Sequence, residues 1–218
     1  MWGTEMVRSR VLGISLGALG LFGVGFLGFR VEGANQGAGS QTVTGDGLDR
    51  VPSQTAVDWV TYGDHLVEMH PVSQDALPVS AEQLNAGEGL IDHKVTFAVD
   101  KTLWSRTGAP DLPATLTWVE PGWEFKGDGR QEFAFGPVRL DSGHEYLVAV
   151  TKFETNGATT PDTWGPLSYA STAMLYDGGR IDAATSDPVS QVTRAVDGQP
   201  AEALAALLTA TLPDPLAA

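Results

Sequence analysis

The chain has 218 residues, a formal net charge of −14 and no cysteine. The missing cysteine excludes disulfides, cysteine-ligated zinc, a thiol nucleophile and a lipid-modified cysteine anchor. The acidic balance repels phosphate backbones, so we expect no nucleic-acid partner.

A membrane segment is predicted near the N-terminus. Residues 11–29 are uncharged and apolar, and they follow a short stub, residues 1–10. As a helix this stretch spans roughly 28 Å, enough to cross the hydrocarbon core of a bilayer. Because Arg8 and Arg10 precede it, the positive-inside rule places the N-terminus in the cytoplasm and the rest of the chain outside. We therefore predict a single-pass signal anchor in the cell membrane; a cleaved signal peptide is the alternative and exports the same residues.

Glycines recur along this segment, and Gly13, Gly17 and Gly20 share one helical face. Small residues at this spacing let two membrane helices approach closely, so the face is a candidate homodimer contact. Glycine is also common in membrane helices generally, which is the alternative explanation. Residues 30–54 follow and are rich in Gly, Ser, Thr and Gln, so they are predicted to be a flexible linker that keeps the folded domain close to the membrane.

Strand signals fill the predicted folded domain, residues 55–182, and glycine and proline separate them. In Ile91–Trp104 apolar and polar residues alternate, as in a half-buried antiparallel strand. Glu145–Phe153 is apolar on both faces over its centre, so we expect it to be the most buried strand. Further strands are predicted at Tyr62–Pro71, Ala114–Glu120, Phe133–Leu140 and Ala170–Tyr176.

Helical signals lie around these strands. Ser80 begins a short helical turn, and Pro188–Val196 and Pro200–Thr211 each start with proline, which suits the first helical position. The last segment carries one apolar stripe that is predicted to dock on the strands: Leu204, Leu207, Leu208 and Leu212. The fold class is therefore mainly β: a small antiparallel OB-like barrel or a sandwich, with one or two helices in residues 183–218 and a transmembrane helix before it.

The segment YGDHLVEMHP (Tyr62–Pro71) contains two of the four histidines. As a strand it places His65 and His70 on opposite faces, so the two cannot bind one ion. Glu68 and His70 share a face, and with His93 they are candidate metal ligands. The alternative is a strand with ordinary polar residues. Since no HExxH, GxSxG or phosphate-binding loop is present, we assign no catalytic residue and expect no cofactor.

Tryptophans near strand ends are the remaining candidates. Trp123 and Trp164 are candidate ligand-binding residues, because an exposed indole can stack on a sugar ring. Core packing is the alternative for both, since tryptophan is also a large apolar residue.

Several pieces of the chain, in order, resemble a pattern found in uncharacterised actinobacterial exported proteins: VTFAVDKTLWSR at 95–106, Gly122-Trp123, GHEYL at 143–147 and WGPL at 164–167. In these proteins a membrane segment precedes a small β-domain, and the resemblance implies no activity. More distantly, VTFAVDKTLW followed by a glycine turn and EYLVAV is similar to OB-type barrels of the netrin and metalloprotease-inhibitor kind. Those inhibitors use an N-terminal cysteine, which this chain lacks, so inhibition is not implied.

These observations favour a non-enzymatic binding or scaffolding module, tethered to the outer face of the cytoplasmic membrane, with an envelope protein or glycan as its partner. The alternative is an exported hydrolase that uses carboxylates on envelope glycans. The chain has 27 acidic residues, which offer many pairs, and the sequence singles out none of them.

Overall fold

A computed structural model of the chain describes residues 42–45, 50–135, 140–154, 163–168, 171–183 and 190–217. The strands, in chain order, are β1 (Thr42–Gly45), β2 (His65–Ala76), β3 (Glu88–Ser105), β4 (Thr115–Lys126), β5 (Gly129–Phe135), β6 (Tyr146–Phe153), β7 (Thr163–Pro166) and β8 (Ala173–Leu175). The helices are α1 (Ala56–Tyr62), α2 (Ala81–Ala86), α3 (Gln191–Val196) and α4 (Ala201–Ala210), with a 3-10 turn, η1, at Asp177–Gly179.

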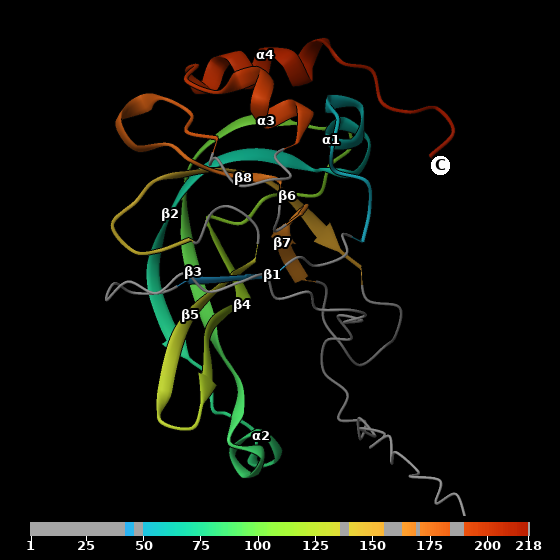
Figure 1. The fold of residues 1–218 in the computed structure, drawn as a ribbon. Coiled ribbons are helices and arrows are strands. Elements are labelled where there is room, and N and C mark those ends of the chain that lie inside the picture. Colours follow the sequence, from blue (N-terminus) through green and yellow to red (C-terminus); the bar gives the residue numbers. More distant parts are fainter. Residues whose placement is uncertain are drawn as a thin grey trace, which may run out of the picture.

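The strands form one curled sheet. Their order is β1-β5-β4-β3-β2-β6-β7, and β8 pairs with β6. All named pairings are antiparallel except that of β1 with β5. The long strands β2 and β3 bend so that the sheet forms a half-barrel (Figure 1). Register shifts interrupt the β2–β3 pairing, and such bulges increase local twist. The prediction of a mainly β, antiparallel fold with C-terminal helices is confirmed.

Strands β2 and β6 separate two hydrophobic clusters. The inner cluster lies within the curl of the sheet, where the rings of Phe97 and Trp118 stack with centroids 4.2 Å apart. The outer cluster lies between the sheet and helices α1, α3 and α4, which cover one end of the molecule in Figure 1. Since side chains alternate along a strand, Leu147 of β6 enters the outer cluster and Val148 enters the inner one. Strand β6 is thus buried on both faces, as predicted.

The last helix docks on the sheet as predicted, but its apolar stripe is shorter. Leu204 and Leu208 are buried in the outer cluster, and Leu207 is partly buried against it. Leu212 was expected to continue the stripe, and this was wrong, because its side chain is 82% exposed. The physical reason is that α4 ends at Ala210 and the backbone of Thr211 is already extended.

The N-terminal side of the domain differs from the prediction. Within the predicted linker, residues 42–45 form β1, which pairs in parallel with β5. Helix α1 was not predicted; Thr55 and Asp58 form a capping box at its start. The helix is short, and its β-branched residues Val57, Val60 and Thr61 favour strands, so the sequence pattern does not predict a helix here. Among the described residues no helix is long and apolar enough to cross a membrane, and the predicted membrane segment, residues 11–29, lies outside them.

Candidate functional site

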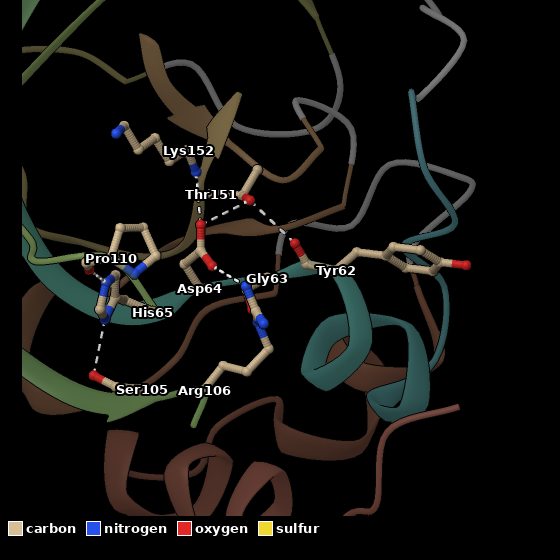
Figure 2. A network of polar contacts seen from close by, with 9 residues as sticks. All are labelled: Tyr62, Gly63, Asp64, His65, Ser105, Arg106, Pro110, Thr151 and Lys152. Atoms are coloured by element: carbon tan, nitrogen blue, oxygen red, sulfur yellow. Dashed lines mark hydrogen bonds and ion pairs between the residues drawn. The ribbon is translucent and has the colours of Figure 1, made fainter. Parts of the chain in front are cut away.

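Polar side chains gather at the end of the sheet where β2 begins and β3 ends (Figure 2). Helix α1 ends there at Gly63, whose N–H donates to Trp59 O at 2.9 Å. The chain then turns directly into β2, so Asp64 and His65 follow the helix without a loop. His65 is the register partner of Ser105, the last residue of β3.

The carboxylate of Asp64, at the start of β2, contacts β6 and the residue that follows β3. Its Oδ2 accepts from Thr151 Oγ1 at 3.1 Å and from the N–H of Lys152 at 2.8 Å, both on β6. Its Oδ1 pairs with Arg106 Nη2 at 2.5 Å, although Asp64 is only 2% exposed. Arg106 also donates through Nε to Gly63 O at 3.1 Å. Both carboxylate oxygens therefore have hydrogen-bond partners, and Asp64 and Arg106 together connect the end of α1 with the start of β2, the end of β3 and β6.

The hydrogen bonds of His65 define its tautomer. Nε2 lies 2.9 Å from Pro110 O, and Nδ1 lies 2.8 Å from Ser105 Oγ. A carbonyl oxygen only accepts hydrogen bonds, so Nε2 of His65 carries the proton. In the neutral ring Nδ1 then has no proton, and it accepts a hydrogen bond from the hydroxyl of Ser105.

Solvent reaches only one member of this pair. Ser105 is exposed, whereas His65 is only 5% exposed and lies behind it. The half-buried ring of Trp164 on β7 lies beside the imidazole, with centroids 5.6 Å apart and planes tilted by 38°. The arrangement offers a ligand one indole and one hydroxyl, whereas the guanidinium of Arg106, which is 39% exposed, is held by Asp64 and Gly63 O. It also resembles the hydrogen-bonded hydroxyl–imidazole pairs of nucleophilic catalysis, with a third group that orients the base.

The three candidate metal ligands are not brought together. Glu68 is the register partner of Lys101 and His70 that of Ala98, whereas His93 pairs in register with Ala76, near the other end of β2. Five positions separate positions 98 and 93 on β3, which is roughly 16 Å of strand. His93 is buried against the ring of Trp123 at a centroid distance of 4.2 Å. The part of the chain that the structure describes contains no cluster of three or more metal-type ligands.

Glu68 and His70 lie instead on a charged outer part of the sheet. His70 Nδ1 is 2.7 Å from Asp100 Oδ2, an exposed contact. Burial, and secondly the nearby carboxylate of Glu145, raise the pKa of the Glu68 carboxyl. Lys101 lowers this pKa in part, and it also forms an exposed ion pair with Glu202 of α4.

The two candidate tryptophans lie at different ends of the sheet. Trp123 is the register partner of Ile91, near the start of β3. Trp164 is the partner of Lys152 on β6 and lies beside His65, which is paired with the last residue of β3. The two indoles therefore cannot form one platform.

The Ser105–His65 pair was missed by sequence reasoning. Forty residues separate its members, so no local motif contains both. His65 was considered only as a metal ligand, and Ser105 carries no signal of its own. Only the register of β2 against β3 places them side by side.

The chain matches no protein-family model, no curated protein sequence and no solved structure. Its function must therefore be inferred from the geometry of its own residues.

Proposed function

We propose that the chain is a binding module for glycans of the cell envelope and that its ligand contacts Trp164, His65 and Ser105. The single observation that carries this proposal is the position of Trp164. Its half-buried indole lies 5.6 Å from the imidazole that holds an exposed hydroxyl. Ligand sites typically combine an apolar wall with a few placed polar groups.

A sugar suits this combination of groups. Its ring presents C–H groups to an indole face, and its hydroxyls exchange hydrogen bonds with Ser105. The charge of the chain favours an uncharged partner over an anionic one, because a net charge of −14 repels phosphate and acidic polymers. The Asp64–Arg106 ion pair supports this site, since it joins the two strands next to the His65–Ser105 pair.

The proposal includes the place where binding occurs. Residues 11–29 would anchor the chain in the cytoplasmic membrane with the folded domain outside, as Arg8 and Arg10 favour. Contact between two copies would use Gly13, Gly17 and Gly20. The likeness to actinobacterial exported proteins with an OB-like barrel belongs to the same proposal, and the curled antiparallel sheet supports it.

One observation favours the alternative, a carboxylate-based hydrolase. The pKa of Glu68 is raised, first by burial and then by Glu145, and a carboxyl group with a raised pKa is one half of a glycosidase pair. If the chain hydrolyses glycans, and this activity is lost in Glu68→Gln and retained in Trp164→Ala, the hydrolase is the correct function and the binding module is rejected.

The binding proposal is tested with the full chain in detergent micelles. Cosedimentation with purified peptidoglycan, and titration with β-1,4-linked N-acetylglucosamine oligosaccharides, measure the affinity. We expect Trp164→Ala to weaken binding at least about tenfold, as loss of a central aromatic contact does. Trp123→Ala is the matched control, a half-buried tryptophan at the other end of the sheet, and should bind as the parent does. Absence of binding, or equal losses in both variants, would overturn the proposal.

A further inference from the structure

We propose that Ser105 is a nucleophile activated by His65 and that it takes an acyl group from an ester of the bound ligand. The inference rests on the proposed function for its substrate class, which is an O-acylated sugar. The assignment of the nucleophile itself rests on the hydrogen bonds of His65 alone.

The direction of proton transfer follows from the tautomer. The N–H of Nε2 donates a hydrogen bond to Pro110 O, so Nδ1 of His65 is the basic nitrogen. Nδ1 is already 2.8 Å from Ser105 Oγ. A base within this distance takes the hydroxyl proton as the oxygen attacks. Pro110 O then remains as the acceptor for the imidazolium, as the orienting third group of such sites does.

The pair is held by strand pairing and by a neighbouring ion pair. His65 and Ser105 are register partners, and the residues next to them in the chain, Asp64 and Arg106, form the ion pair in which Asp64 is buried. The N–H of Arg106 also donates to Asp64 O at 2.8 Å. A nucleophile and a base that are locked by strand pairing and by a neighbouring ion pair need little reorganisation before reaction.

The base is buried and the nucleophile is reachable from solvent. His65 is 5% exposed, and Trp164 lies beside its ring. Ser105 is exposed at the last position of β3, where a substrate carbonyl can approach Oγ. The carboxylate of Asp64 does not serve as the third group, since Arg106, Thr151 and Lys152 occupy its oxygens.

The proposed reaction balances without a further reactant except water. Ser105 Oγ bonds to the carbonyl carbon of the ester, and its proton passes to Nδ1 of His65. The carbon–oxygen bond to the sugar breaks, and the sugar oxygen receives the proton from Nδ1. Water then attacks the acyl-serine, His65 takes its proton and returns it to Ser105 Oγ, and the carboxylic acid leaves.

The absence of cysteine from the chain permits a direct test of the pair. Ser105→Cys places one thiol in the full chain, and its alkylation by iodoacetamide is followed from pH 5 to pH 9. A thiol beside a histidine base has a lowered pKa and is largely thiolate near neutral pH. We expect alkylation at pH 6.5 to be about tenfold faster than in Thr107→Cys, an exposed control two residues away.

The role of His65 is tested in the same background. Adding His65→Asn to Ser105→Cys should bring the alkylation rate and its pH profile to those of Thr107→Cys. Because His65 is buried, His65→Gln is made in parallel, and circular dichroism selects the variant that remains folded. Equal rates for Ser105→Cys and Thr107→Cys, or a fast rate that survives loss of His65, would overturn the assignment.

The acyl-transfer step is tested on the unsubstituted chain. With p-nitrophenyl acetate we expect a burst of p-nitrophenolate followed by slow turnover, and Ser105→Ala should abolish both. Thr107→Ala should retain them. No burst would overturn the acyl transfer. The thiol measurement needs no sugar, so the two proposals can fail separately. If the chain binds no glycan but the Ser105→Cys thiol is alkylated rapidly, the binding function is rejected and the assignment of the nucleophile is supported.

Discussion

Asp64 and Arg106 form an ion pair across the start of β2 and the end of β3, with Arg106 Nη2 2.5 Å from Asp64 Oδ1. Removing one partner of a buried pair leaves the other charge uncompensated, which is strongly destabilising. Here Arg106 is partly exposed, and Asp64 keeps its hydrogen bonds from Thr151 and Lys152. We therefore expect Arg106→Ala to lower the free energy of unfolding by about 2–3 kcal/mol, measured by urea titration of the full chain.

Lys101→Ala is the matched control for this prediction. It removes an ion pair with Glu202 in which both side chains are exposed, at 3.5 Å. Such surface pairs contribute at most about 1 kcal/mol. Similar losses in the two variants would show that the Asp64–Arg106 pair is no more than a surface contact.

Gly63 tolerates no side chain, although its backbone is in an ordinary extended conformation. A β-carbon there would lie 2.6 Å from Trp59 O, the carbonyl that accepts the last hydrogen bond of α1. Since Trp59 O is a backbone atom and a β-carbon is bonded directly to the backbone, one of the two segments must move. We expect Gly63→Ala to lower the free energy of unfolding by about 1–3 kcal/mol. Val57→Ala, on the exposed side of α1, should change it by less than about 0.5 kcal/mol, and a neutral Gly63→Ala would disprove the contact.

Glu68 should make stability fall as the pH rises above its ordinary titration range. Burial and Glu145 raise its pKa in the folded state, so the folded chain binds more protons than the unfolded chain between the two pKa values. Stability then decreases as the pH rises through this window. Because solvent screens a partly exposed group, we expect Glu68→Gln to stabilise the chain by less than about 1 kcal/mol at pH 7, and this gain should disappear at acidic pH, as measured by thermal unfolding. Asp111→Asn, in an exposed loop, serves as the control; a variant less stable than the parent at pH 7 would refute the sign.

Asp177 should have the opposite dependence on pH. The N–H of Glu145, and secondly His144, hydrogen-bond to its carboxylate and lower its pKa. The stability that it contributes is present above the unfolded pKa and is lost as the pH falls through the lower folded value. We expect Asp177→Ala to reduce the melting temperature at pH 7, and this difference from the parent should shrink as the pH falls below the ordinary titration range of an aspartate. Asp128→Ala, in an exposed turn, should not show this convergence.

The parts of the fold that could be predicted are those with a long periodic pattern. Alternation over Ile91–Trp104 and the two-sided apolar centre of Glu145–Phe153 determine β3 and β6, because each pattern is maintained over many residues. β1 has only four residues, and its partner strand lies far away in the chain, so no local pattern marks it. The candidate site could not be predicted for the same reason. His65 and Ser105 meet only through the register of two strands, and register depends on the whole sheet.

The double burial of β6 has a consequence for how the protein opens. Its side chains belong alternately to the inner and outer clusters, so separation of either cluster leaves one face of the strand covered. Amide protons in Leu147–Val150 should therefore exchange with solvent only through global unfolding. The exposed turn at Gly127–Gly129 between β4 and β5 should exchange through local fraying instead. Native-state hydrogen exchange would then identify β6 as the strand that makes the two clusters unfold as one cooperative unit.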